Sequence, residues 1–393
     1  MRPYLLRSLI FVFYGLFLLT PLACTSGGHP FLVPLPESPI RDEPVIRVRV
    51  AVSAEPVIAK GSVYSVFDAD GKLIAKNRAE SEQTVKLSGK TLIVSGKTFG
   101  LRDASFADVH TNTSIFVNGA EIPFPVRIAK VNDTTVVLAL VPFERYIAGV
   151  VSSEMPVSWP SEALKAQAVA ARTYALCHMN LSARKPYDVT STTAHQKFNA
   201  SKPADSAIEA AKATRGEVLM YRSRLLMTFY HSTSGGSTAN ASSVFDCSDI
   251  TPLTRVEMRS EQSPHTNWTH RMSWGAFNAK VLEPSGKGMS EPPEKVLVKR
   301  KGDGTVELVT FKGVNDVSMT GRDIRTAVGG MKVKSPNFDI RLSGNIVNIV
   351  GRGFGHRVGM SQYGAKQFAE QGLDYRYILS YFYPGTRCVR LYR

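Results

Sequence analysis

The sequence predicts an α+β fold, in which an antiparallel, β-rich N-terminal region precedes a mixed α/β core with one long helix. Two observations support this fold class. Short runs of alternating apolar and polar residues recur between Val45 and Leu140, and this period of two is typical of half-buried strands. From Ser161 onward, apolar residues instead recur at intervals of three and four, which indicates a long helix.

Composition and charge narrow the class of protein. The chain has 393 residues, of which 43% are apolar and 21% charged, as in ordinary globular proteins of two or three domains. The net charge of +15 favours an anionic partner. Its lysines and arginines are spread along the chain without a nucleic-acid-binding motif. We therefore expect a cell-envelope polymer as partner and no nucleic acid.

The first 24 residues indicate export. Arg2 and Arg7 precede an apolar run from Ser8 to Ala23, which is short for a membrane span and typical of a signal sequence. The run ends at Cys24 and is similar to a bacterial lipoprotein signal, with lipid on the Cys24 sulfur. Pro21 stands where such signals usually carry leucine, so a plain secretory signal or an uncleaved anchor stays an alternative. We expect a membrane-anchored protein of the bacterial cell envelope.

A proline-rich segment and a β-rich region follow the signal. Residues 25–44 contain five prolines and predict an extended tether. Residues 45–130 form the β-rich region, with turns at Asp68–Gly71, Asn118-Gly119 and, just beyond it, Asn132-Asp133. The expected strands are 46–52, 61–67, 91–94, 113–117, 126–131 and 134–140.

The segment from Glu144 to Leu181 contains the first candidate site. An apolar run at Tyr146–Val151 is interpreted as a strand that leads to Glu154. Ser158 or Ser161 then caps a helix, whose buried stripe is Leu164, Ala168, Ala171 and Ala175.

Glu154 is a candidate acid or base because apolar neighbours and nearby cations can tune the pKa of a carboxyl group. Lys165 and Arg172 are seven residues apart and project from one side of the helix, where we expect them to border Glu154. The alternative interpretation is a solvated loop glutamate and two ordinary surface charges.

The remaining chain alternates helices and strands. A helix is expected at 205–214, a hairpin at 217–220 and 225–231, and a mobile loop at 280–303. Strands are expected at 338–342 and 346–350, and a helix at about 361–370. The hairpin leads to His231-Ser232-Thr233-Ser234-Gly235-Gly236, a set of hydroxyls and glycines that suits hydrogen bonding to a sugar, although an exposed polar turn would look the same.

Cysteine usage leaves the pairing open. Cys177, Cys247 and Cys388 remain if Cys24 is lipidated, and an odd number cannot pair completely. Cys177 is expected as a small core residue of the long helix. A Cys247–Cys388 disulfide would suit an exported protein, but the spacing does not establish it.

Three motifs in order resemble the stage II sporulation protein D family (SpoIID/LytB). They are VVSSEMPVSWPSEALKAQAVAARTYAL from Val150, FYHSTSGGSTANA from Phe229 and GRGFGHRVGMSQYGA from Gly351, which Tyr383-Pro384-Gly385-Thr386 follows. The resemblance covers roughly Val141 to the C-terminus, and we take residues 131–393 as the family domain.

The resemblance implies a peptidoglycan lytic transglycosylase, which cleaves the β-1,4 bond between N-acetylmuramic acid and N-acetylglucosamine and leaves a 1,6-anhydro ring. Glu154 would be the single general acid and base. The residues expected to bind the glycan strand are Lys165, Arg172, His231, Ser232, Ser234, Gly355, His356, Ser361, Gln362 and Tyr363.

Two departures from the family pattern matter. Some relatives bind zinc through Cys and His, whereas this chain has Thr190, Ala194 and His195 at those positions, and a single His lacks the ligand set that zinc needs. We therefore predict no metal and no cofactor. Arg357 replaces the middle glycine of Gly-His-Gly-Val-Gly, which adds a cation or narrows the cleft.

The LytB side of the family supports an alternative from another functional class. It implies a non-enzymatic wall-binding protein that stimulates an N-acetylmuramoyl-alanine amidase. Retention of Glu154 with Lys165 and Arg172 favours the enzyme, and a cell-wall amidase remains an expected partner.

Overall fold

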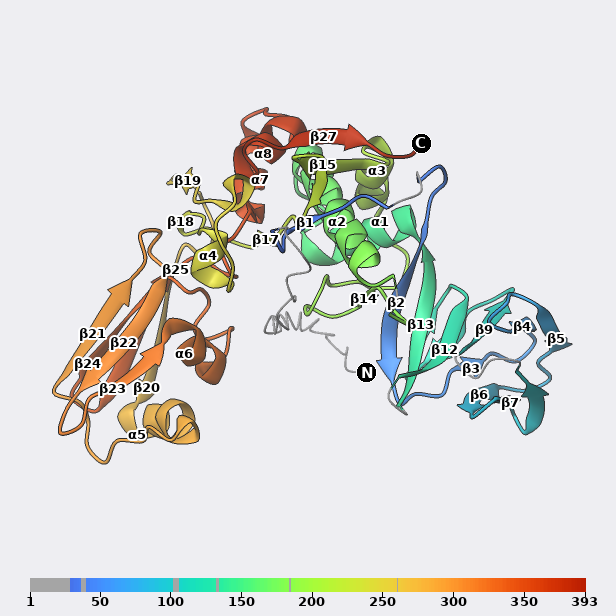
Figure 1. Ribbon diagram of the computed structural model, residues 1–393, viewed down its shortest axis with the longest axis horizontal. Coiled ribbons are helices and arrows are strands. Elements are labelled where there is room, and N and C mark those ends of the chain that lie inside the picture. Colours follow the sequence, from blue (N-terminus) through green and yellow to red (C-terminus); the bar gives the residue numbers. More distant parts are fainter. Residues whose placement is uncertain (1–28, 37–39, 102–105, 132–133, 184, 260) are drawn as a thin grey trace, which may run out of the picture.

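The computed structural model describes residues 29–36, 40–101, 106–131, 134–183, 185–259 and 261–393. The expected signal sequence with Cys24 and the Asn132-Asp133 turn therefore lie outside the described residues. No helix of the described part is long and apolar enough to cross a membrane. Almost all strand pairs are antiparallel, and most of the longer helices gather around the helix Ser161–Leu181 (Figure 1), which confirms the α+β class.

The N-terminal region is antiparallel β, as predicted. Its strands are β2 (Val45–Val52), β3 (Val57–Ile58), β4 (Val63–Phe67), β5 (Leu73–Arg78), β6 (Gln83–Ser88), β7 (Thr91–Val94), β8 (Lys97–Gly100), β9 (Phe106–Thr111), β10 (Ile115–Val117), β11 (Ala120–Ile122), β12 (Val126–Val131) and β13 (Thr134–Pro142). They form one sheet in the order β2-β13-β12-β9-β4-β5, to which β14 (Val189–Thr190) of the core adds beside β2. The second sheet has the order β11-β10-β3-β6-β7-β8. The long pairing of β13 with β2 places the end of β13 against the helical core.

The core surrounds one long helix. Its elements are α1 (Phe143–Glu154), α2 (Ser161–Leu181), β14 (Val189–Thr190), α3 (Asp205–Ala213), β15 (Glu217–Tyr221), β16 (Arg224–Leu226), β17 (Tyr230–His231), β26 (Met360–Ser361), α7 (Gln362–Glu370), α8 (Tyr375–Phe382) and β27 (Arg387–Arg390). Helix α2 runs between α1, α3 and α7 and the sheet that contains β15 (Figure 1). Its many alanines are buried, which allows neighbouring elements to approach it closely.

The predicted strand at Tyr146–Val151 is wrong, because these residues lie inside helix α1. A short apolar run cannot distinguish a buried strand from a buried helix, and this run is buried all round. The predicted N-cap is also wrong, because Pro160 holds that position of α2 without a side-chain hydrogen bond. Helix α2 itself is confirmed.

Part of the expected tether belongs to the core. Strand β1 (Leu32–Val33) pairs antiparallel with β16. Phe31 and Val33 are buried, and the Phe31 ring packs edge-on against Phe229, with centroids 4.8 Å apart. Apolar burial therefore holds this segment to the core.

A β-rich module with its own apolar core lies between the second and third motifs. Its elements are β20 (Asn267–Ser273), α5 (Trp274–Phe277), η2 (Asn278–Leu282), η3 (Glu283–Ser285), β21 (Lys295–Arg300), β22 (Val306–Lys312), β23 (Val317–Thr320), α6 (Gly321–Val328), β24 (Phe338–Ser343) and β25 (Ile346–Arg352). The expected loop at 280–303 is partly wrong, because β21 pairs with β22 along its length. The connecting elements are β18 (Gly236–Ser237), α4 (Ala241–Val244), η1 (Thr251–Leu253) and β19 (Glu257–Met258).

Candidate functional site

Glu154 is the last residue of α1. The helix ends there because Pro156 disfavours helical backbone in the residue before it, and Met155 is extended. The backbone carbonyl of Glu154 accepts a hydrogen bond from Gln362 Nε2 at 3.2 Å. Glu154 Oε1 accepts one from the backbone N–H of Lys197 at 2.7 Å. Helix α7 thus holds the backbone of Glu154, and the loop before α3 holds its carboxyl group.

Glu154 lines a cavity of about 100 Å³. The cavity is formed by the end of α1, helix α2, the loop before α3, strand β17, helix α6 with Gly330 just after it, the glycine-rich loop and the start of α7. Its lining residues are Glu154, Tyr174, Thr193, His195, Phe229, Tyr230, His231, Ser232, Arg325, Gly330, Gly355, His356 and Gln362. All three sequence motifs therefore contribute to one pocket.

The second and third motifs meet through backbone pairing. Strand β17 runs parallel to β26, with His231 opposite Ser361. Thr233 and Phe354 exchange two backbone hydrogen bonds of 3.0 and 2.8 Å. Gly359 has φ +70°, and a Cβ there would lie 2.1 Å from the Phe229 carbonyl oxygen. Only glycine fits this position, which explains one glycine of the motif.

The electrostatics of Glu154 suit proton transfer. Burial raises the pKa of Glu154 to about 7, while the hydrogen bond from the Lys197 N–H and the Lys197 charge act in the opposite direction. Desolvation therefore dominates, since it disfavours the charged carboxylate. Both protonation states of Glu154 are populated near neutral pH.

Two of the three histidines that line the pocket, His231 and His356, are held neutral. Burial lowers the pKa of His231 well below its usual value and lowers that of His356 to about 3. His231 Nδ1 donates to the Val358 carbonyl at 3.2 Å, and its Nε2 is buried without a partner among the described residues. A neutral ring of this tautomer presents Nε2 as an acceptor.

Six of the residues proposed from the sequence share the pocket, namely Glu154, His231, Ser232, Gly355, His356 and Gln362. Three others lie behind it. Ser234 and Ser361 both donate side-chain hydrogen bonds to Glu261. Tyr363 donates its backbone N–H to the Ser232 carbonyl and packs its ring on Trp159.

Lys165 and Arg172 do not border Glu154, so this prediction is wrong. Arg172 is completely buried and forms a two-pronged ion pair with Glu144, with Nε–Oε1 and Nη2–Oε2 distances of 2.9 and 2.7 Å. Lys165 pairs with Glu162 one turn earlier on the same helix. The seven-residue spacing aligned the two side chains along the helix but did not show which neighbours that face meets.

Glu261 is a functional candidate that the sequence did not reveal. It is buried, and its Oε2 accepts hydrogen bonds from Ser234 N–H, Ser234 Oγ and Gly235 N–H at 2.6 to 3.1 Å. Its Oε1 accepts from Ser361 Oγ. Burial raises its pKa despite these donors. Glu261 joins the second motif to the third, and no local pattern around it signals that role.

The segment before α3, where the family resemblance led us to consider zinc, contributes His195 to the pocket wall. Its Nδ1 lies 3.1 Å from Thr190 Oγ1, and burial lowers its pKa to about 4. Among the described residues, no group of three or more His, Cys, Asp and Glu side chains could hold a metal ion. In the same part of the chain Cys177, Cys247 and Cys388 are free thiols, and Cys177 is a buried core residue as expected.

Comparisons with known proteins agree on one family. Residues 131–221 match the family described as SpoIID, stage II sporulation protein. The stage II sporulation protein D of Bacillus amyloliquefaciens is 32% identical over 271 residues, which cover 63% of this chain and 74% of that protein. An uncharacterized protein of Brachyspira hyodysenteriae is 32% identical over 79% of this chain and 85% of its own length. The amidase enhancer of Bacillus subtilis is 28% identical over 61% of this chain and 40% of its length.

Proposed function

The chain belongs to the stage II sporulation protein D family, and we propose that it acts on the bacterial cell wall as a peptidoglycan lytic transglycosylase. The bond cleaved is the β-1,4 linkage between N-acetylmuramic acid and N-acetylglucosamine. The observation that supports this proposal is a single carboxyl group, Glu154, with a pKa near 7 in a pocket formed by all three motifs.

Glu154 acts in both halves of the reaction. As the protonated acid, it donates its proton to the glycosidic oxygen while the bond from that oxygen to the muramic C1 breaks. As the carboxylate, it takes the proton of the muramic C6 hydroxyl while O6 bonds to C1 and closes the 1,6-anhydro ring. The same group is therefore regenerated, in the acid-then-base order of glycosidases with an internal hydroxyl in place of water.

The surroundings of Glu154 support this use. Since Oε1 already accepts the Lys197 N–H, Oε2 is the oxygen that carries the transferable proton. A pKa near ambient pH suits a group that must serve as both acid and base. We assign the sugar contacts to the lining residues His231, Ser232, Gly355, His356 and Gln362, which offer uncharged hydrogen-bonding groups.

Ser234, Ser361 and Tyr363 are assigned a supporting role. They hold the two motif loops together through Glu261 and through the Ser232 carbonyl. A rigid second layer of this kind keeps contact residues in productive geometry.

The direct test is product analysis. Purified glycan strands are incubated with the full-length protein, and their ends are identified by mass spectrometry. We expect 1,6-anhydro-muramic ends, whose mass is one water lower than that of hydrolysed ends. Hydrolysed ends alone, or no new ends at any protein concentration, would overturn the proposal.

Similarity to the amidase enhancer of Bacillus subtilis favours a second candidate, a non-enzymatic protein that stimulates a cell-wall amidase. In that case the protein would leave glycan strands intact and would raise the rate of a purified N-acetylmuramoyl-alanine amidase. Running both assays on the same preparation separates the two candidates.

We also propose that the protein is exported and membrane-anchored through lipid on Cys24. Membrane fractionation and fatty-acid labelling of the wild-type protein and Cys24→Ala test this. Label on the wild type and release of the variant are expected, whereas an unlabelled wild type would contradict lipidation.

A further inference from the structure

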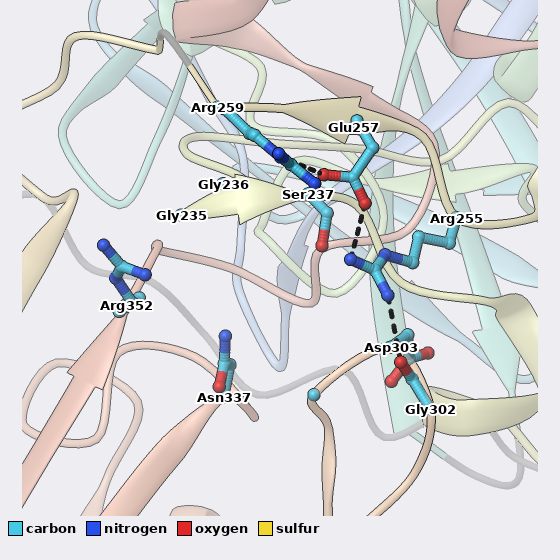
Figure 2. Close-up of a pocket in the computed structure, with 11 residues that line it drawn as sticks. Gly235, Gly236, Ser237, Arg255, Glu257, Arg259, Gly302, Asp303, Asn337 and Arg352 are labelled. Atoms are coloured by element: carbon cyan, nitrogen blue, oxygen red, sulfur yellow. Dashed lines mark hydrogen bonds and ion pairs between the residues drawn. The ribbon is translucent and has the colours of Figure 1, made fainter.

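A second, larger cleft lies beside the Glu154 pocket. Its volume is about 560 Å³, and it opens between the connecting segment of the core and the β-rich module (Figure 2). Its lining residues are Gly235, Gly236, Ser237, Arg255, Glu257, Arg259, Gly302, Asp303, Gly304, Asn337 and Arg352. We refer to it as the arginine cleft.

The cations of the arginine cleft outweigh its acids. Figure 2 shows Arg255 and Arg259 together on Glu257, with Arg352 across the open space from them. The Asp303 carboxylate is turned to the backbone N–H groups of neighbouring loops rather than to these arginines. Arg352 has no carboxylate partner among the described residues; its Nε donates to the Asn267 side chain at 3.2 Å.

Arg357 adds a buried cation directly behind the lining. Its Nε donates to the Ser234 carbonyl and its Nη2 to the Ser237 and Asp303 carbonyls, at 2.9 to 3.2 Å. It is only 1% exposed, its Nη1 has no partner, and it forms no ion pair with a described residue. Burial lowers the pKa of Arg357 to about 10, although the charges of Asp303 and Glu261 act in the opposite direction. An anion in the adjacent cleft would stabilise this buried cation further.

The arginine cleft and the Glu154 pocket share one wall. Ser232 lines the pocket and Gly235 lines the arginine cleft. They are three positions apart, so their Cα atoms are at most about 11 Å apart. On a second segment, Arg352 lines the arginine cleft and Gly355 lines the pocket, again three positions apart. The Thr233–Phe354 bridge joins the two segments. Thr233 and Ser234, which lie between Ser232 and Gly235, are buried, so one short stretch of backbone separates the two sites.

We propose that the arginine cleft binds a carboxylate carried by the glycan strand whose bond lies at Glu154. This inference rests on the proposed function and adds that the protein recognises an acidic group on its substrate. Arginine forks match carboxylates with paired hydrogen bonds. Two sources offer this group, the lactyl carboxylate of a peptide-free muramic residue and the carboxyl groups of an attached peptide.

The test measures binding to the full-length Glu154→Gln protein, which separates binding from cleavage. The probes are peptide-free glycan fragments, the same fragments with methyl-esterified carboxylates, and peptide-bearing fragments, each titrated by calorimetry. The variant is Arg259→Gln with Arg352→Gln, since both side chains are exposed. The matched control is Arg341→Gln, an exposed arginine on β24 that does not line the arginine cleft. Thermal melts check that each protein is folded.

We expect the double variant to bind acidic fragments about tenfold more weakly or worse, as for lost charge-assisted hydrogen bonds. Esterified fragments should bind both proteins equally, and the control should match the parent. If the double variant binds peptide-free fragments more weakly, the lactyl carboxylate is the bound group. If it binds only peptide-bearing fragments more weakly, the bound group is a carboxyl group of the peptide.

Equal binding of acidic and esterified fragments to the parent protein would overturn the proposal. The proposal would also be overturned if the double variant bound a phosphate polymer, such as teichoic acid, more weakly but bound the carboxylate fragments as well as the parent does. Failure of the proposed function gives a different result, namely no anhydro ends from the wild-type protein while the acidic fragments still bind.

Discussion

Helix α1 carries a glutamate at each end, and the two have opposite environments. Glu144 lies in its first turn and Glu154 is its last residue. Burial alone would raise the pKa of Glu144, but the Arg172 charge and hydrogen bonds from Arg172, Tyr392 and the Gly216 N–H lower it. Burial raises the pKa of Glu154 to about 7, because only the Lys197 backbone and charge oppose it.

This difference shows which charged groups pair with each other in the segment from Glu144 to Leu181. The arginine of α2 neutralises Glu144, and the resulting cluster ties α1, α2, α3 and Tyr392, next to the C-terminus, together. No cation of α2 reaches the Glu154 carboxyl group. Glu154 is therefore free to hold a proton near neutral pH, which a nearby arginine would prevent.

Glu154→Gln should have the largest effect on activity. The amide keeps the shape of the side chain and can still accept the Lys197 N–H, but it has no proton to transfer. We expect glycan cleavage to fall by about 10²- to 10⁴-fold, measured as anhydro ends per unit time. Glu162→Gln, which alters a partly exposed glutamate of α2, is the matched control. Cleavage near the wild-type rate in Glu154→Gln would remove Glu154 from the mechanism.

Arg172→Ala should have the largest effect on stability. Removing one partner of a buried ion pair leaves Glu144 charged and unpaired, so the free energy of unfolding should drop by about 3–5 kcal/mol. Lys165→Ala on the same helix should change it by less than about 0.5 kcal/mol. Denaturant unfolding of both variants measures this. An Arg172→Ala protein that is as stable as the wild type but inactive would instead indicate that Arg172 acts in the functional site.

The pH dependence of stability should distinguish the two ends of α1. The folded-state pKa of Glu154 is above its unfolded value. In comparison with Glu154→Gln, the contribution of Glu154 to wild-type stability is therefore fully present below pH 4.5 and is lost as the pH rises through about 7. Glu154→Gln should therefore be more stable than wild type at pH 8, by ~1–3 kcal/mol. Glu144→Gln should show the opposite sign, because a lowered pKa stabilises the folded protein above pH 4.5. Parallel melts of these variants at pH 4, 6 and 8 measure both effects. The same sign for both variants would contradict the comparison.

Chelator treatment should have the smallest effect. The prediction follows from Thr190 and Ala194 at positions where relatives carry zinc ligands. Cleavage before and after EDTA should agree within about twofold, with a known zinc hydrolase as positive control. Inactivation by EDTA that added zinc reverses would show the prediction of no metal to be wrong.

Local patterns determined much of this protein in advance. Period-two alternation placed β2, β4, β7, β10, β12 and β13 but missed β3, β5, β6, β8, β9 and β11. Three-to-four spacing placed α2, because both patterns report which face of an element is buried. The three motifs identified the family and most of the pocket residues. The proline-ended segment beside a long helix drew attention to Glu154, and the family resemblance favoured a catalytic role over a solvated loop glutamate.

The tertiary structure decided which partner each charged group meets. Arg172 and Lys165 look equivalent in the sequence, yet one is buried against Glu144 and the other lies on the surface. Glu261 acquires its role only where β17 and α7 come together. Arg357 becomes a buried cation beside the arginine cleft only because β21 and β22 bring Asp303 to it. Such contacts join residues tens to hundreds of positions apart, and the spacing of residues along one helix or strand carries no record of what packs against it.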